Sequence, residues 1–298
     1  MILVDILLPT FNGEKYIKDQ IESLLFQSHK EINIYIRDDC STDNTFNILK
    51  EMSIRDKRII MINQPSMNLG IVASVEALLN QSKSDFIMFC DQDDIWFPEK
   101  VKVMLNSILN HENSFGKDIP LLVHSDCFVT DKNLKIKGRF KKNRPLKYGL
   151  AKSLFMYNVQ GSSSIINKSL KKEILPFNEF VYIHDRYFHL VSELVGKRFY
   201  IQEPLMYYRQ HNDNVLGSKS FFKKLLLNIN NLNQTYYQYK DKNLLLYFLR
   251  NGYSENQLLI VYQLLTAGKK NRIKKLKLMY TNKISMRIKE FLLLIIKG

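Results

Sequence analysis

The N-terminal third of the chain alternates short apolar segments with helical patterns, and this alternation restricts the possible folds more than any other feature of the sequence. The apolar segments fit buried strands and lie at residues 4–8, 32–36, 59–62 and 86–90. Between the first two, Ile17, Ile21 and Leu24 recur at helical spacing. Strand and helix repeated in this way produce a mainly parallel sheet with helices on both faces. The sequence therefore predicts an α/β fold.

Polar residues follow each of the four predicted strands. They are Thr10, Asn12 and Glu14 after the first strand, Asp38 and Asp39 after the second, Asn68 and Gly70 after the third, and Asp91 and Asp93 after the fourth. Ligands of open α/β sheets bind beyond the carboxyl ends of the strands. Ordinary loops with capping residues would explain any one of these clusters, but they explain four together less well. We therefore expect a ligand site at this edge of the sheet.

The densest polar cluster is an acidic turn, residues 91–94, directly after the fourth apolar segment. Its three carboxylates, on Asp91, Asp93 and Asp94, would repel one another unless a cation lies among them. Oxygen ligands of this kind suit Mg²⁺ or Mn²⁺ better than zinc. A solvated turn that caps the helix beginning near Pro98 would place the same residues together. The segment alone favours neither interpretation.

The composition argues against several classes of protein. A chain of 298 residues with 45% hydrophobic residues can bury a large core. No apolar run reaches the roughly 18 residues of a membrane span, and Asp5 interrupts the apolar N-terminus, so we interpret that segment as a strand and not as a secretory signal. Three cysteines without C-x-x-C spacing fit a reducing cytoplasm. Neither a G-x-G-x-x-G motif nor a P-loop motif occurs, so those two nucleotide-binding classes are not supported.

The C-terminal part of the chain differs from the rest in charge and in pattern. Residues 219–298 contain 16 Lys and Arg against 3 Asp and Glu, a net charge of +13 out of +15 for the whole chain. Apolar residues recur there at helical spacing, so we predict a domain boundary near residue 218 and a basic helical region after it. This region could bind an anionic membrane surface. It could equally pack on the first domain, or on a second copy of the chain in a homodimer.

Six short motifs, in order along the chain, together resemble a known enzyme family. They are Leu8-Pro9-Thr10-Phe11-Asn12, Arg37-Asp38-Asp39-Cys40-Ser41-Thr42-Asp43, Asn68-Leu69-Gly70, Asp91-Gln92-Asp93-Asp94-Ile95-Trp96, His184-Asp185 and Tyr208-Arg209-Gln210-His211. The chain resembles the inverting family 2 glycosyltransferases of the GT-A fold. It is similar to the bacterial rhamnosyltransferase-like enzymes of surface polysaccharide synthesis. The resemblance covers residues 1 to about 217, and the order and spacing of the six motifs carry it.

The resemblance implies a donor site for a nucleoside-diphosphate sugar. Pro9, Thr10, Phe11 and Asn12 would hold the base and ribose together with Asp39. The Phe11 ring could stack on a pyrimidine and Asp39 could accept its ring N–H, which suits uracil and thymine equally.

Four further residues are expected on the donor side, namely Glu14, Asn68, Gly70 and Gln92. The Gln92 amide could hydrogen-bond a sugar hydroxyl. Cys40 departs from the family pattern, which usually has Gly or a small polar residue at this position, and we expect this change to be mild.

The resemblance also implies a divalent cation, Mn²⁺ or Mg²⁺. Asp93 would bind it, and Asp91 would face the metal or the ribose, so that the ion bridges the two phosphates and offsets the charge of the leaving group. His211, with Arg209, would complete the metal shell or contact the diphosphate. A histidine in this position is as readily an ordinary hydrogen-bonding residue, so the sequence leaves the role of His211 open.

Asp185 stands where the family places its catalytic base, at the start of a helix. As a base it would take the proton of the acceptor hydroxyl while that oxygen attacks the anomeric carbon from the face opposite the diphosphate. Asp185 would also serve as a helix cap, and the two roles are compatible. Trp96, Gly161, His184 and Arg186 are expected on the acceptor side. For Trp96, a place in the core is an equal alternative.

These implications combine into an expected function. The protein would be an inverting, metal-dependent transferase that moves a sugar from dTDP-rhamnose or a UDP-sugar to a hydroxyl of a lipid-linked bacterial cell-surface glycan. We expect it in the cytoplasm, peripheral at the inner face of the cell membrane. Residues 1–218 would divide into a nucleotide-sugar half, about 1–98, and an acceptor half, about 99–218.

Two other functions fit the sequence less well. A sugar nucleotidyltransferase would carry a glycine-rich loop with Lys or Arg after the first strand, and residues 10–14 lack it. A nucleic-acid-binding protein could use the basic region, where Tyr236, Tyr237 and Tyr239 could stack on bases. The amphipathic pattern of that region and the lack of a known binding motif lead us to expect no nucleic-acid partner.

Overall fold

The computed structural model describes residues 2–63, 65–140, 148–150, 153, 159–211, 243–244, 247–248 and 251. Its strands are β1 (Val4–Thr10), β2 (Ile32–Asp38), β3 (Ile59–Met61), β4 (Phe86–Phe89), β5 (Ile95–Trp96), β6 (Leu121–Thr130), β7 (Ile136–Arg139), β8 (Ser164–Asn167) and β9 (Lys197–Arg209). Its helices are α1 (Ile17–Leu25), α2 (Thr45–Arg55), α3 (Gly70–Gln81), α4 (Lys100–Phe115), α6 (Lys168–Ile174) and α7 (His184–Val195), with a short 3₁₀ turn, η1, at Gly161–Ser163.

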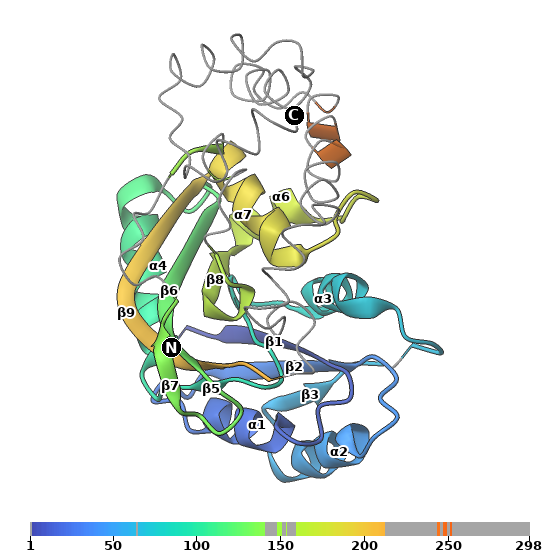
Figure 1. Cartoon of the computed structure of the whole chain (residues 1–298). Coiled ribbons are helices and arrows are strands. Elements are labelled where there is room, and N and C mark those ends of the chain that lie inside the picture. The colour runs from blue at the N-terminus through green and yellow to red at the C-terminus, as the bar shows by residue number, and fades with distance from the viewer. Residues whose placement is uncertain are drawn as a thin grey trace, which may run out of the picture.

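These strands form one mixed sheet in the order β3-β2-β1-β4-β8-β6-β9-β5, with β7 paired to β6 (Figure 1). Strands β1 to β4 are parallel to one another, as the strand–helix alternation predicts. Strand β8 enters antiparallel between β4 and β6, and β6 then pairs parallel with β9. The predicted α/β fold is confirmed, and the antiparallel pairs lie mainly in the second half of the chain.

Helices cover both faces of the sheet (Figure 1). Because successive strand residues point to opposite faces, Ile6 packs into one core and Leu7 into another. The first core contains buried residues of α1, α2 and α4, among them Ile21, Leu49 and Met104. The second contains buried residues of α3, α6 and α7, among them Val75, Leu170 and Phe188. Two cores of this size hold the sheet rigid, so the loops at its edge start from fixed positions.

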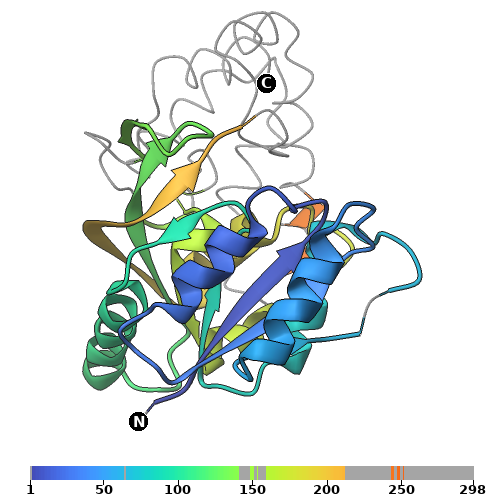
Figure 2. The same cartoon turned by 90° about the horizontal axis from the view of Figure 1, so that it is seen from below.

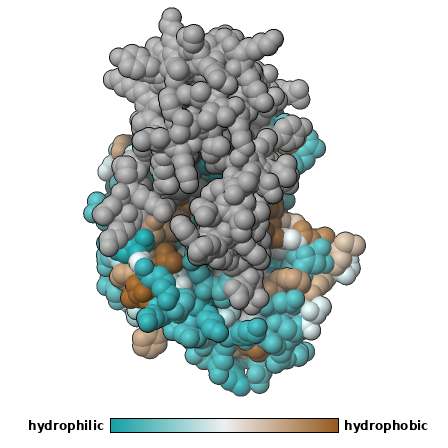
Figure 3. All heavy atoms as spheres, in the orientation of Figure 1, coloured by the Kyte–Doolittle hydropathy of each residue, from teal (hydrophilic) through white to brown (hydrophobic). Residues whose placement is uncertain are grey.

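The outer faces of α1 and α2 are solvated. Figure 2 shows the two helices side by side across one face of the sheet. On the side shown in Figure 3, the part of the molecule that contains α2 is mostly hydrophilic, with scattered apolar residues. Single exposed apolar side chains of this kind are normal on soluble proteins.

Strand β9 continues through a proline. The structure has one strand, Lys197–Arg209, that runs through Pro204. The register with β6 shifts between Ser125 and Asp126 and again between Asp126 and Phe128. These irregularities accommodate a proline, which cannot donate a ladder hydrogen bond, so the strand continues past it.

The predicted basic helical region and its boundary near residue 218 lie almost entirely outside the described residues, so both stay predictions. Three described residues of this region contact the second core. Leu244 and Phe248 are buried in it, and the Phe248 ring lies parallel to Tyr187 with centroids 6.3 Å apart. This part of the region therefore packs on the α/β domain. No helix among the described residues combines the length and hydropathy needed to cross a bilayer.

Candidate active site

The loops after β1 and β4 are joined by a pair of hydrogen bonds between Phe11 and Gln92. The Phe11 N–H donates to Gln92 Oε1, and Gln92 Nε2 donates to the Phe11 carbonyl, both at 2.9 Å. A Cβ on Gly13 would lie 2.5 Å from the same Gln92 oxygen, so a larger residue there would displace the Gln92 amide from these hydrogen bonds. Gln92 was expected to contact the sugar, but in this structure its amide holds the first loop against the acidic turn.

The loop after β2 is tied to the start of α3 by Asp39. One carboxylate oxygen of Asp39 accepts from the Leu69 N–H at 3.0 Å and the other from the Gly70 N–H at 2.7 Å. Asn68 Nδ2 donates to the Asp39 carbonyl at 3.1 Å. Gly70 has a φ of +83°, which glycine adopts without strain. The predicted donor residues Asp39, Asn68 and Gly70 are thus brought together, with Asp39 as their centre.

The remaining predicted donor residues lie in the loop after β1, next to the loop after β2. Thr10 Oγ1 donates to Asp38 Oδ1 at 3.1 Å, and the N–H groups of Thr42 and Asn44 donate to the side chains of Asn12 and Glu14 at 2.8 and 2.9 Å. Pro9 pairs in register with Arg37, beyond the last pairing of β1 with β4.

The side chain of Phe11 stands apart from this network. It is 44% exposed, so its ring is available to a ligand. Beside it, Asn12 (φ 50°) and Cys40 (φ 62°) both have left-handed backbone. Strained positions of this kind cluster at ligand sites, and the φ of Cys40 explains why glycine suits this position.

The acidic turn meets the end of β9 through Asp93 and His211. His211 Nε2 lies 2.8 Å from Asp93 Oδ2, so the two residues expected to share a metal are in contact. Within the part of the chain that the structure describes, no three His, Cys, Asp or Glu side chains converge as a preformed metal cage. Mg²⁺ and Mn²⁺ are commonly held by one or two protein ligands together with substrate phosphates, and this donor set fits such a site.

The electrostatics of the turn place Asp185 beside it. Burial, followed by repulsion from Asp93 and then from Asp185, raises the pKa of Asp91 to about 7. Asp94 is fully buried, and its Oδ1 accepts the Arg209 N–H at 3.1 Å, which supports the turn and the end of β9. Burial and the charges of Asp91, Asp94 and Asp93 raise the pKa of Tyr208, so this tyrosine also lies near the acidic turn.

Asp185 is held at the first turn of α7 by two backbone groups. Its Oδ1 accepts the Arg186 N–H at 2.7 Å, and its Oδ2 accepts the Gly161 N–H at 3.3 Å. A Cβ on Gly161 would lie 3.1 Å from His184 Nε2 and 3.2 Å from Asp185 Cβ, a tight fit for any larger residue. Asp185 is 8% exposed. The structure therefore combines a fixed carboxylate with a position in reach of the acidic turn.

The other residues expected on the acceptor side have different surroundings. His184 lies near the Phe89 ring, and burial lowers its pKa. Trp96 is 2% exposed and belongs to the first core. Of the two roles that the sequence left open, contact with the acceptor or a place in the core, the structure has Trp96 in the core. Arg186 was expected to contact an acceptor, but its guanidinium is buried and donates from Nη1 to the Ser153 carbonyl.

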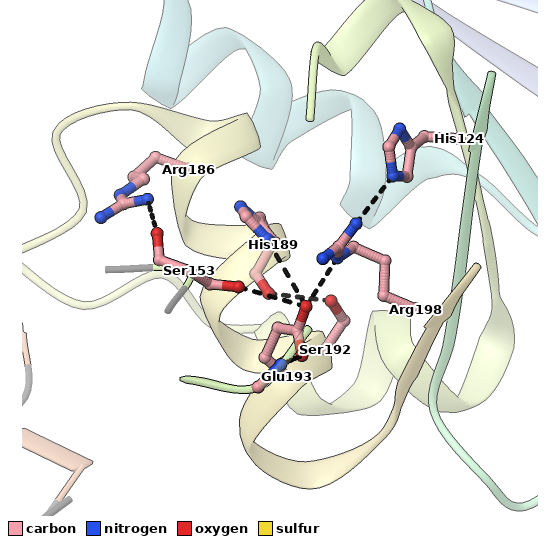
Figure 4. A network of polar contacts seen from close by, with 8 residues as sticks. His124, Ser153, Arg186, His189, Ser192, Glu193 and Arg198 are labelled. Carbon is pink, nitrogen blue, oxygen red and sulfur yellow. Dashed lines mark hydrogen bonds and ion pairs between the residues drawn. The ribbon is translucent and has the colours of Figure 1, made fainter. Parts of the chain in front are cut away.

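Arg186 forms part of a buried polar network that extends along α7 (Figure 4). At its centre, Glu193 accepts from Arg198 Nε at 2.7 Å and from Ser153 Oγ at 3.2 Å. Burial would raise the Glu193 pKa, but contact with His189 and the charge of Arg198 outweigh it and lower this pKa to about 2. Arg198 Nη1 lies 2.9 Å from His124 Nε2. The network ties α7, and with it Asp185, to β6, β9 and Ser153.

Sequence reasoning missed Lys100, which is completely buried beneath the acidic turn. Its ammonium donates to the Ser162 carbonyl at 2.6 Å and lies 3.6 Å from the centroid of the Trp96 ring. Burial lowers its pKa to about 7. A signal was present in the sequence, because Lys100 occupies the apolar face of α4 one turn before Met104 and two turns before Ile108.

Comparisons with known proteins show the family to which the chain belongs. The model of the family described as Glycosyl transferase family 2 matches residues 5–171. The "dTDP-rhamnosyl transferase RfbG" of Shigella flexneri is 29% identical over 232 residues, which make up 72% of this chain and 75% of that protein. The "UDP-Glc:alpha-D-GlcNAc-diphosphoundecaprenol beta-1,3-glucosyltransferase WfaP" of Escherichia coli is 28% identical over 230 residues, 76% of this chain and 84% of that protein.

Solved structures with the same fold include two proteins in complex with a nucleotide sugar. S. aureus TarS 1-349 in complex with UDP-GlcNAc superimposes with a TM-score of 0.61 at 15% identity, covering 98% of this chain and 79% of that chain. The mannosyltransferase PcManGT from Pyrobaculum calidifontis, in complex with GDP-Man and Mn²⁺, has a TM-score of 0.55 at 12% identity, covering 93% and 84%. At these identities the structures show the fold, while the family match shows the relationship. The chain belongs to glycosyl transferase family 2, and it is a glycosyltransferase with the GT-A fold.

Proposed function

We propose that this enzyme transfers a sugar, with inversion and with a divalent cation, from a nucleoside diphosphate to a hydroxyl of a lipid-linked bacterial glycan. The observation that carries the proposal is the placement of Asp185 beside the acidic turn. Asp185 comes from α7, yet its charge is close enough to raise the pKa of Asp91. A base candidate therefore lies near the residues that would hold the donor phosphates.

The donor would lie along the edge formed by the loops after β1, β2 and β4. The exposed ring of Phe11 is available to stack on a pyrimidine. The carboxylate of Asp39 is fixed by Leu69 and Gly70, which leaves lone pairs for a base N–H because a carboxylate can accept about four hydrogen bonds. These residues account for recognition of uracil or thymine.

Asp93, Asp91 and His211 would hold Mn²⁺ or Mg²⁺ together with the diphosphate. Such an ion, when bound, neutralises charge on the departing diphosphate. Asp185 would accept the proton of the acceptor hydroxyl during its attack on the anomeric carbon. Two hydrogen bonds from backbone N–H groups fix the direction of its carboxylate, so the base is oriented before the acceptor arrives.

The names of the relatives support the finer parts of the proposal. One is described as a dTDP-rhamnosyl transferase and another as a glucosyltransferase that acts on a diphosphoundecaprenol-linked sugar. We propose dTDP-rhamnose or a UDP-sugar as donor, and an acceptor at the inner face of the cell membrane. The basic region at residues 219–298 would bind that anionic surface. The alternative role that we propose for this region is homodimerisation.

The experiment that tests the donor is a panel of UDP-, dTDP- and GDP-sugars, screened for Mn²⁺-dependent thermal stabilisation of the full chain. We expect at least one UDP- or dTDP-sugar to raise the thermal unfolding midpoint in the presence of Mn²⁺, and Asp93→Ala to abolish this rise. Absence of stabilisation by every nucleotide sugar, with either Mn²⁺ or Mg²⁺, would contradict the proposal. A change in the thermal unfolding midpoint on addition of single-stranded RNA, without a change on addition of anionic vesicles, would instead favour a nucleic-acid partner for the basic region.

A further inference from the structure

Tyr16 lies at the junction between the donor loop and the end of β9. It is the residue before α1, and its N–H donates to the Gly13 carbonyl at 3.0 Å. Its own carbonyl accepts the Gln20 N–H at 3.1 Å. The backbone of Tyr16 is therefore fixed from both sides, by the loop that carries Phe11 and Asn12 and by the first turn of α1.

The ring of Tyr16 contacts two residues that follow one another closely at the end of β9. Its centroid lies 4.6 Å from that of the His211 ring, at an interplanar angle of 35°. The guanidinium carbon of Arg209 lies 4.6 Å from the same Tyr16 centroid. Contacts of these two kinds are each worth roughly twofold to tenfold in an equilibrium constant, and they depend on the aromatic ring rather than on the hydroxyl.

These contacts connect Tyr16 to the acidic turn through a single intermediate. His211 Nε2 lies 2.8 Å from Asp93 Oδ2, and the His211 ring also contacts the Tyr16 ring, so His211 lies between Tyr16 and Asp93. Asp93 and His211 come from segments 118 residues apart, so their approach depends on how well the end of β9 is held. Asp94 holds the backbone of this segment by accepting the Arg209 N–H, and the Tyr16 ring contacts the side chains of the same segment.

We infer that Tyr16 is a positioning residue, whose ring fixes the His211 imidazole and the Arg209 guanidinium for the metal and diphosphate. This inference rests on the proposed function for the identity of the ligand. It concerns a residue outside the six motifs, and it assigns the effect to the aromatic ring. Replacement of Tyr16 by phenylalanine should therefore be harmless, whereas an aliphatic side chain of similar size should not be.

The functional test is a double-mutant cycle on binding of UDP or dTDP with Mn²⁺, measured by calorimetry on the full chain. We expect Tyr16→Leu to weaken this binding about 3- to 10-fold and Tyr16→Phe to leave it within about twofold of wild type. In a His211→Ala background, Tyr16→Leu should cause a smaller loss, because its effect acts partly through His211. Phe26→Leu, at the exposed opposite end of α1, serves as the matched aromatic control.

A second measurement is independent of any nucleotide. In the metal-free protein, the Tyr16 ring current should shift the His211 ring protons, and Tyr16→Leu should remove that shift in the NMR spectrum while Tyr16→Phe keeps it. Equal Mn²⁺-dependent binding in wild type and Tyr16→Leu, or full additivity with His211→Ala, would overturn the inference. If wild type binds neither nucleotide, the proposed function fails separately, and unchanged His211 resonances in Tyr16→Leu would then overturn this inference as well.

Discussion

His211 Nε2 lies 2.8 Å from Asp93 Oδ2, and this contact joins the end of β9 to the acidic turn after β4. The two residues are 118 positions apart in the sequence. Their approach brings one nitrogen and one carboxylate to the place where the donor diphosphate is expected. A divalent ion that uses one or two protein ligands would obtain the rest of its shell from phosphate and water.

Removal of either member of this pair should weaken metal-dependent binding of nucleotide. We expect Asp93→Asn to reduce Mn²⁺-dependent affinity for UDP or dTDP by at least about tenfold, since it removes a charged ligand, and His211→Ala to reduce it less. Calorimetric titration with and without Mn²⁺ measures both effects. His29→Ala, a surface histidine that contacts the Ile2 carbonyl, is a suitable control. Equal affinity of Asp93→Asn and wild type would rule out Asp93 as a metal ligand.

Asp39 should affect both stability and donor binding. In Asp39→Asn, one side-chain atom becomes a donor that faces the N–H of Leu69 or Gly70, so one hydrogen bond is lost. We expect the free energy of unfolding to fall by about 1–3 kcal/mol, and the affinity for uracil or thymine nucleotides to fall as well. Urea unfolding and nucleotide titration measure the two effects. Asp85→Asn, whose partner Lys168 is at the surface, should change neither.

Lys100 should matter for stability because its ammonium is buried among the residues that support the site. Lys100→Met keeps the apolar stem but leaves the Ser162 carbonyl and the nearby carboxylates without their cation. We expect the free energy of unfolding to fall by about 1–3 kcal/mol, because the buried Ser162 carbonyl loses its hydrogen-bond donor. Lys102→Met removes an exposed lysine two positions away and should leave the unfolding midpoint unchanged. Similar midpoints for the two variants would contradict this role.

His189 should make the protein less stable in mild acid. Burial, assisted by the charges of Arg198 and Arg186, lowers its pKa from 6.5 to about 3. Between these values the unfolded chain binds a proton that the native protein does not, so stability is complete above about pH 6.5 and decreases as the pH falls towards 3. His184, whose pKa is also lowered by burial, acts in the same direction.

The test is the pH dependence of the free energy of unfolding between pH 7 and pH 5. One fully buried histidine contributes a slope of up to about 1.4 kcal/mol per pH unit. We expect His189→Gln to have a shallower slope than wild type, whatever its absolute stability. Parallel curves for the two proteins would show that His189 does not titrate as its burial requires.

The sequence predicted those features of the fold that repeat or that depend on local pattern. The parallel half of the sheet followed from the alternation of apolar segments with helices such as the one containing Ile17 and Ile21. The meeting of Asp93 with His211, suggested by the resemblance, is present in the structure. The ring of Phe11 is exposed, and its stacking on a base stays a prediction.

Other features depend on contacts between distant segments, which a local pattern does not encode. Gln92 bonds to the backbone of Phe11, and Arg186 points into the network along α7, because the partners of both are set by the tertiary arrangement. The continuity of β9 through Pro204 depends on register shifts opposite it in β6. Tyr16 has no signal in periodicity or motif, since its importance arises from the position of its ring against Arg209 and His211.

The acidic turn and Asp185 would have separate roles, because the turn would hold the donor and Asp185 would take the acceptor proton. The most direct measurement is donor affinity and nucleoside-diphosphate release in the same preparation of Asp185→Asn, with the nucleotide sugar that stabilises the wild type. We expect a dissociation constant within about twofold of wild type and nucleoside-diphosphate release at least about 100-fold slower, since general-base catalysis contributes on that order. Release at the wild-type rate by Asp185→Asn would contradict this role of Asp185.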